Sequence, residues 1–139
     1  MSWIIAAILS AVFAALVAVF GKIGVKSVDT TVATTVRAIV MAGVLIIATL
    51  SLGKGHLFSS FSSRTLTFVV LSGLAGAVSW LFYFFALRYG PATAVAALDR
   101  LSIVFVVVLA ALFLNESLSW KAASGAVLMS VGAILLVLK

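Results

Sequence analysis

The chain has 139 residues, of which 65% are hydrophobic and 9% are charged, and its mean hydropathy is +1.41. A soluble domain of this length could not bury so much apolar surface in a single core. The chain has no cysteine, which excludes disulfide bonds and thiolate metal sites. Its formal net charge is +6, but the basic residues stand mainly at the ends of apolar runs, where they face anionic lipid headgroups. We therefore expect an integral membrane protein that contacts lipid and binds no nucleic acid.

Five apolar runs fill almost the whole sequence. A bilayer core about 30 Å thick is crossed by roughly 20 apolar helical residues, and each run has about this length. The runs predict helices over residues 3–26, 30–52, 64–89, 91–114 and 118–138. The expected fold is thus an all-α integral membrane protein with five transmembrane helices, in which residues 1–139 form a single membrane domain.

The first two expected helices carry local signals of packing and capping. Small residues recur at helical spacing in the first helix, among them Ala7, Ala11 and Ala14, and small residues let helix backbones approach closely in lipid. A packing face is the first interpretation, and a face that lines a cavity is the alternative. Asp29 precedes the second helix and is a good N-terminal capping residue.

The third expected helix becomes aromatic in its second half. Part of this cluster is typical of the belt that aromatic side chains form at a membrane interface. Trp80 and Tyr83 lie deeper, where they either pack in the core or line a substrate path. Gly90 and Pro91 then predict a sharp joint, with Gly90 ending the third helix and Pro91 in the first turn of the fourth.

Arg37, Asp99 and Arg100 lie inside expected spans, where a charged side chain costs at least about 2.5–3.5 kcal/mol. At about 1.5 Å per helical residue, Arg37 lies about 10 Å and Asp99 about 12 Å from the same membrane surface. An ion pair between them would pin the second helix to the fourth. The functional alternative is that Asp99 binds a proton or another cation, or that an arginine holds an anionic group of a substrate. Asp99 and Arg100 are adjacent, so they point about 100° apart and cannot serve the same face.

Other polar residues favour simple structural roles. His56 is the sole histidine and lies in a Gly-rich loop, so we expect a solvated residue. The segment around it lacks the spaced glycines of a phosphate-binding loop. Glu116 precedes the fifth expected helix, where a carboxylate favours the positive helix end. We expect no catalytic residue, no cofactor and no resident metal, and hence no enzyme.

Several segments of the sequence resemble the EamA-type domain of the drug/metabolite transporter superfamily. These are YFFALRYGPATAVAALDRLS at residues 83–102 and FLNESLS at residues 113–119, followed by a Gly-containing last helix. FGKIGV at residues 20–25 and TTVRAIV at residues 34–40 extend the resemblance to the first two helices. Most members of this family are similar to a tandem of two five-helix domains in opposite orientations. This chain resembles a single, half-size domain.

The resemblance implies a secondary transporter, coupled to an ion or another gradient, that moves a small metabolite or drug-like molecule by alternating access. A five-helix chain supplies half of such an inverted architecture, so we expect an antiparallel homodimer of five plus five helices. The expected lining of the substrate path is Ser10, Trp80, Tyr83 and Asp99. The expected location is the prokaryotic inner (plasma) membrane. The alternatives to an antiparallel homodimer are a parallel dimer and a heterodimer with an oppositely oriented paralogue. The alternative functions are a non-transporting subunit of a larger complex, half of a heterodimeric transporter, or a lipid-linked sugar flippase.

The basic residues near the helix ends are almost evenly divided between the two sides of the membrane. The side of the N-terminus has three, Lys54, Arg64 and Lys121, and the opposite side has four, Lys22, Lys26, Arg88 and Lys139. Because positive charge selects the cytoplasmic side, this balance predicts that the chain inserts in both orientations.

Overall fold

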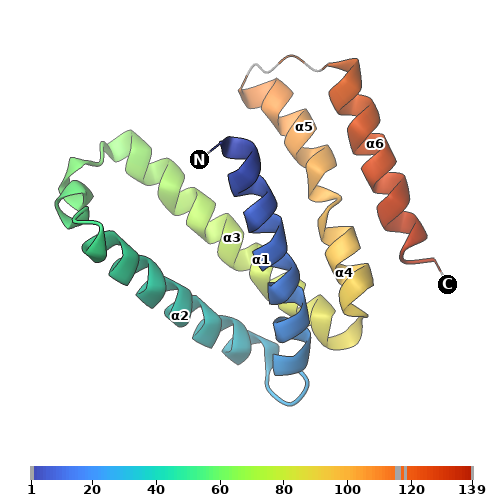
Figure 1. Cartoon of the computed structure of the whole chain (residues 1–139), viewed down its shortest axis with the longest axis horizontal. Coiled ribbons are helices and arrows are strands. Elements are labelled where there is room, and N and C mark those ends of the chain that lie inside the picture. Colours follow the sequence, from blue (N-terminus) through green and yellow to red (C-terminus); the bar gives the residue numbers. More distant parts are fainter. Residues whose placement is uncertain (1, 115–116, 118, 139) are drawn as a thin grey trace. The chain divides into compact units, whose positions relative to one another are not determined.

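The computed structural model of the chain describes residues 2–114, 117 and 119–138. Every regular element in these residues is helical, as Figure 1 shows. The chain divides into two compact units: a central unit of residues 23–88, and a terminal unit of residues 1–22 and 89–139.

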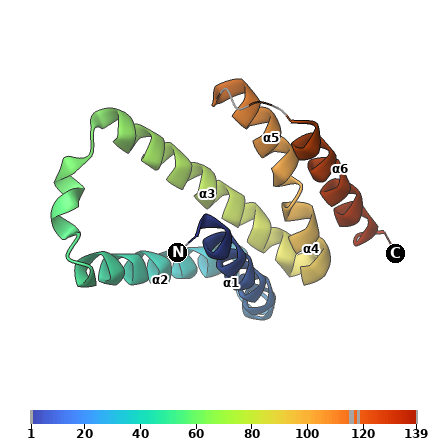
Figure 2. The same cartoon turned by 45° about the horizontal axis from the view of Figure 1, so that its top comes forward.

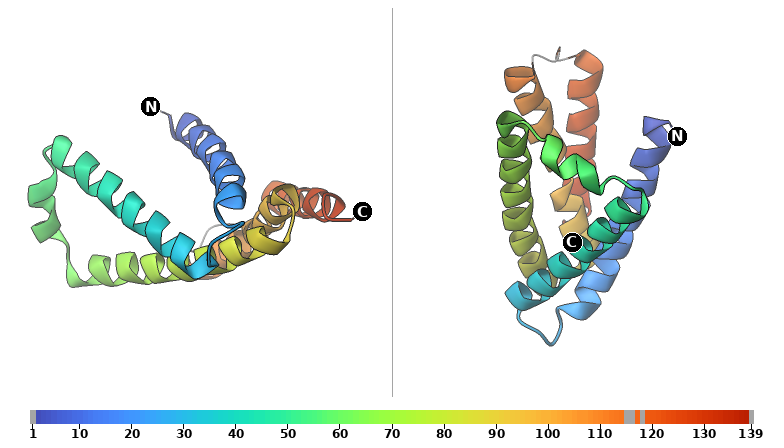
Figure 3. Two further views of the ribbon diagram at one scale, coloured as in Figure 1. Left: turned by 90° about the horizontal axis from the view of Figure 1, so that it is seen from below. Right: turned by 90° about the vertical axis from the view of Figure 1, so that its left-hand side faces the viewer.

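The central unit consists of α2 (Thr30–Ser51), the short 3-10 helix η1 (Gly55–Ser60) and α3 (Ser63–Tyr89). Helices α2 and α3 approach each other where α2 begins and α3 ends, and they diverge toward η1, which connects their far ends (Figures 1 and 3). Near their close ends, Arg88 Nη1 donates a hydrogen bond of 2.7 Å to the carbonyl oxygen of Val28. This bond ties the end of α3 to the segment that leads into α2.

The start of α2 is capped by the side chain of Asp29. Its carboxylate accepts hydrogen bonds from the backbone N–H groups of Thr31 at 2.8 Å and Val32 at 3.2 Å. These are two of the N–H groups that have no partner inside the helix, so the cap expected from the sequence is confirmed.

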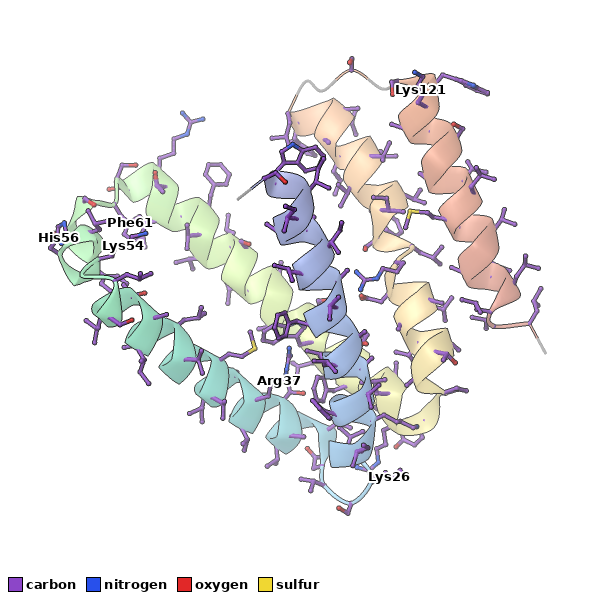
Figure 4. All side chains as sticks on the ribbon, in the orientation of Figure 1. Lys26, Arg37, Lys54, His56, Phe61 and Lys121 are labelled. Carbon is purple, nitrogen blue, oxygen red and sulfur yellow. The ribbon has the colours of Figure 1, made fainter. Side chains whose placement is uncertain are left out.

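The end of α2 depends on Gly53, which adopts a φ of 68°. The N–H groups of Gly53 and Lys54 donate to the carbonyl oxygens of Leu50 and Thr49, both at 2.9 Å. This pair of bonds satisfies carbonyls of the last turn, and it requires a left-handed residue, which glycine adopts without strain. The chain then enters η1, where His56 is exposed as expected and lies near Lys54 and Phe61 (Figure 4).

The terminal unit contains α1 (Trp3–Gly24, up to Lys22), α4 (Ala92–Asp99), α5 (Ser102–Phe113) and α6 (Trp120–Leu135). Helix α6 packs against both α4 and α5, and Figure 2 shows α5 and α6 side by side. The buried residues on these helices are mostly small, among them Ala18, Ala97, Ala126 and Ala133. Lys22 Nζ donates to the carbonyl oxygen of Gly90 at 2.8 Å, which ties the end of α1 to the joint before α4.

Four stretches of the described residues are long and apolar enough to cross a membrane. They are α1, α2, α3 and the stretch Ala92–Phe113 that α4 and α5 form together. Helix α6 is a shorter apolar helix of 16 residues, about 24 Å long. The chain is therefore an all-α membrane protein.

The structure describes the starts of α4 and α6 in more detail than the sequence predicts. Pro91 stands directly before α4 with an extended backbone (φ −61°, ψ 139°), and its carbonyl accepts the first helical bond from Val95. The fixed φ of proline suits this capping position as well as the first turn. Glu116 lies outside the described residues, and the hydroxyl of Ser119 caps α6 by accepting from the N–H of Ala122 at 3.1 Å.

Acid should destabilise the start of α2 through Asp29. Hydrogen bonds from the backbone N–H of Val32, and then of Thr31, hold the pKa of Asp29 below its ordinary value of 3.8. Because the folded state favours the ionised form, the stabilisation is complete above the ordinary pKa and is lost as pH falls through the lowered one. The midpoint temperature of thermal unfolding should fall further between about pH 6 and about pH 2 in the wild type than in Asp29→Asn. The reason is that asparagine caps the helix without titrating. Equal acid sensitivity of the two proteins would contradict this role.

Candidate functional site

The Arg37 side chain of α2 contacts two aromatic rings of α3. Its Cζ atom lies 4.0 Å from the ring centroid of Trp80 and 5.3 Å from that of Phe84. Trp80 and Phe84 are four residues apart and thus share one face of α3. A guanidinium stacks well on aromatic faces, so the two rings hold Arg37, labelled in Figure 4, and join α2 to α3.

The guanidinium of Arg37 is not fully satisfied by this contact. Its Nη1 atom is buried and makes no hydrogen bond to any described residue. An arginine stays charged in proteins, and a buried donor without a partner costs about 1–3 kcal/mol or more. A desolvated cation–π contact contributes about 2 kcal/mol, which offsets much of this cost but supplies no acceptor. The described part of the chain therefore leaves the Nη1 amino group of Arg37 available to donate to an acceptor.

A groove of about 900 Å³ runs between α2 and α3 and is open to one side. Its walls combine small, hydroxyl-bearing and apolar side chains. From α2 these are Thr31, Thr34, Thr35, Ala38, Met41, Ala42 and Leu45, and from α3 they are Val69, Ser72, Gly73, Gly76, Ala77, Trp80 and Leu81. A mostly apolar wall with a few polar groups is typical of sites for small molecules, which occupy roughly 300–1,000 Å³.

The hydroxyl groups of the groove are polarised by the helix that carries them. Thr34 Oγ1 donates to the carbonyl oxygen of Thr30 at 2.7 Å, and Thr35 Oγ1 donates to that of Thr31 at 2.9 Å. Their hydrogens are thereby used, and their oxygens can only accept further bonds. Trp80 both lines the groove and stacks on Arg37, so this wall of acceptors lies beside a cationic donor.

The fourth expected helix is divided into α4 and α5 by a tightened turn, which Figure 1 shows. Around this break, backbone N–H groups donate to carbonyls three residues back, where an α-helix would use the fourth. The bonds are 3.0 or 3.1 Å long and run from Arg100 to Ala97, Leu101 to Leu98, Ile103 to Arg100 and Val104 to Leu101. Asp99 has a low helix propensity because its carboxylate competes for backbone hydrogen bonds, which favours a break at this point. A short 3-10 stretch inside a helix often marks a functional hinge.

The structure brings together only some of the site residues predicted from the sequence. Trp80 stacks on Arg37, and the ring of Tyr83 lies 6.2 Å from that of Phe84 beside this cluster. Asp99 and Arg100 lie exposed at the α4–α5 break, and neither forms an ion pair with a described residue of the terminal unit.

Two further expectations, the place of Ser10 in a substrate path and the ion pair between Arg37 and Asp99, are not tested by the structure. Ser10 lies exposed on α1 in the terminal unit. Arg37 and Asp99 belong to different units, so their ion pair stays a prediction.

Two features of the site were not predicted. Phe84 joins Trp80 around Arg37, and the four-residue spacing of the two aromatic residues could have indicated this shared face. The helix break has a weaker sequence signal, because only the adjacent charges Asp99 and Arg100 distinguish it from the apolar residues on both sides.

Comparison with known proteins gives one family and one relative. A model of the EamA-like transporter family matches residues 1–138. A protein of Sinorhizobium sp named "Uncharacterized transporter in cobO 3'region" is 44% identical over 135 residues, which are 97% of this chain and 96% of the relative. The match thus covers almost the whole length of the relative as well. No solved structure matches.

Replacing Trp80 should weaken the contact between α2 and α3. We expect Trp80→Leu to lower the free energy of unfolding by about 2 kcal/mol, the value of a desolvated cation–π contact. The matched control is Trp120→Leu, because Trp120 is exposed at the first position of α6 and its loss should change stability by less than about 0.5 kcal/mol. Denaturant titration in detergent micelles, followed by circular dichroism, measures both changes. Equal stability of the two variants would show that the stacking on Arg37 contributes little.

Proposed function

The chain belongs to the EamA-like transporter family, and on that premise we propose that it is a secondary transporter that works as an antiparallel dimer. The family and the name of its relative identify a membrane transporter, which is not an enzyme. The proposed cargo is a small metabolite or drug-like molecule, moved by alternating access. The proposed location is the prokaryotic inner membrane, which the bacterial source of the relative supports.

The observation that carries this proposal is the pair of exposed charges at the α4–α5 break. Asp99 and Arg100 lie there without an ion pair to any described residue of the terminal unit. At about 12 Å from the surface of a core about 30 Å thick, the break lies close to the midplane. A charge exposed to lipid at that depth costs at least about 2.5–3.5 kcal/mol, so each of the two residues requires a partner outside the terminal unit or a water-filled path, and we propose that a second copy supplies it.

Dimerisation by inverted copies meets this requirement. Broken helices near the midplane, related by an axis in the membrane plane, are a recurring architecture of secondary transporters. Two antiparallel copies would bring both Asp99 residues to a similar depth, because each lies near the midplane. The nearly balanced basic residues permit both orientations.

Each copy supplies a consistent set of roles in this proposal. Asp99 is the coupling site, and Trp80 belongs to a groove that forms part of the substrate path. Arg37 supplies the N–H donor for an anionic group of the substrate. Arg37 could instead be a permanent partner of Asp99. The pair would then only hold two helices together, and replacing either residue would affect stability as well as coupling.

Removing the charge of Asp99 should abolish ion-coupled flux and leave the protein folded. A thermal-shift screen against metabolites, amines and toxic cations first identifies a ligand, and its uptake into proteoliposomes under an imposed ion gradient is then measured. We expect Asp99→Asn to lose gradient-driven accumulation, whereas Asp29→Asn, which removes the same charge outside the spans, should retain it. Unchanged flux with unchanged ion dependence in Asp99→Asn would refute the role of Asp99. A flux-silent protein that always copurifies with another membrane subunit would favour a non-transporting role.

Dual insertion follows from the basic residues near the helix ends. Fusing the C-terminus to reporters active in the cytoplasm or in the periplasm should give activity in both compartments. Arg64→Gln lowers the number of basic residues on the side of the N-terminus from three to two, while the side of the C-terminus keeps four. It should therefore raise the share of chains with a cytoplasmic C-terminus. Reporter activity on one side only, for the unmodified chain, would contradict dual insertion.

A further inference from the structure

The break between α4 and α5 deprives two carbonyl oxygens of their helical partners. In a continuous helix, Ala96 would accept from the N–H of Arg100, and Asp99 would accept from the N–H of Ile103. These two N–H groups donate instead to Ala97 and Arg100, both at 3.1 Å. The carbonyl oxygens of Ala96 and Asp99 therefore gain no backbone donor from across the break, among the residues described.

Two side-chain oxygens lie at the same turn. In a 3-10 turn, where each N–H donates to the carbonyl three residues back, the side chains of residues i and i+3 lie directly above each other. Asp99 and Ser102 have this spacing and therefore share one face of the turn. The carboxylate of Asp99 and the hydroxyl of Ser102 thus join the two backbone carbonyls, which gives four oxygens within one turn. Arg100 follows Asp99 directly and points about 120° away in such a turn, so its guanidinium belongs to another face.

The electrostatics of this turn favour a cation. Helix α4 ends at Asp99, and the carbonyl end of a helix carries a partial negative charge. The carboxylate adds a full negative charge to the same place. Near the midplane the hydrocarbon offers no water to these oxygens, so a bound cation would satisfy carbonyls and carboxylate at once.

We infer that the α4–α5 break binds sodium and that sodium is the coupling ion of this transporter, an inference that rests on the proposed function. Oxygen ligands select hard cations. One carboxylate neutralises one positive charge, which favours a monovalent ion in hydrocarbon. A carbonyl oxygen coordinates a metal ion but does not take up a proton at physiological pH, so two carbonyls beside the carboxylate fit sodium better than a proton. Water, the substrate or the second copy completes the coordination shell.

Sodium binding can be measured without knowing the substrate. The purified chain in detergent is unfolded thermally while sodium chloride replaces choline chloride at constant ionic strength, with tryptophan fluorescence as the readout. A ligand that binds only the folded state raises the midpoint in a saturable way. We expect sodium to raise it and choline to leave it unchanged. Asp99→Asn should lose the shift, and Asp29→Asn, which removes a carboxylate from outside the spans, should keep it.

A second variant keeps the test decisive if Asp99→Asn does not fold. Ser102→Ala retains the carboxylate and removes one oxygen ligand, so it should raise the half-saturating sodium concentration about tenfold. Ser124→Ala, which removes a hydroxyl that donates to the Lys121 carbonyl, should leave it unchanged. An identical midpoint in sodium and choline for the wild type would overturn the inference. An undiminished sodium shift in folded Asp99→Asn, or an unchanged half-saturating concentration in Ser102→Ala, would do the same.

Flux measurements separate this inference from the proposed function. Accumulation that a pH gradient drives in sodium-free proteoliposomes would overturn sodium coupling and leave the transporter proposal intact. A saturable sodium shift that Asp99→Asn removes, in a protein without flux under any gradient, would support the binding site and contradict the proposed transport.

Discussion

The hydrocarbon core of the membrane supplies no hydrogen-bond partners, and the structure depends on this constraint. Each backbone or charged group in a span must find its partner within the protein. Asp29 satisfies N–H groups at the start of α2, and Lys22 and Arg88 donate to the carbonyls of Gly90 and Val28. Where no acceptor is at hand, Arg37 uses the faces of aromatic rings. The ends of the helices are therefore determined by polar contacts more than by apolar packing.

The same constraint makes it costly for a polar group to have no hydrogen-bond or ionic partner within its own unit. Among the described residues, such groups are Nη1 of Arg37, the charges of Asp99 and Arg100, and the carbonyls that the α4–α5 break leaves without their helical donors. A chain that stayed alone in lipid would bear the cost of each. A transporter gains from such groups, because a substrate, a coupling ion or a second copy can satisfy them in one state and leave them in another. This explains why polar chemistry persists in a chain that is 65% hydrophobic.

The two units offer complementary chemistry. The central unit has a groove with acceptor hydroxyls on one wall and a cationic donor beside it, which suits an amphipathic ligand with an anionic group. The terminal unit has a broken helix with a carboxylate and freed carbonyls, which suits a cation. Coupled transport requires binding of both kinds, and in an antiparallel pair each would be present twice.

The apolar runs, the cap at Asp29 and the joint at Gly90 and Pro91 could all be predicted from the amino-acid sequence. These features depend on composition and on contacts within a few residues, which a linear pattern records. The stacking of the Arg37 guanidinium on Trp80 and Phe84 became visible only in three dimensions, because a linear pattern does not show which side chains of two helices face each other. The helix break also required the structure. Apolar residues flank Asp99 and Arg100 without a nearby glycine or proline. The same sequence is compatible with hydrogen bonds to the third or to the fourth residue back, so only the backbone geometry distinguishes a 3-10 turn from a continuous α-helix.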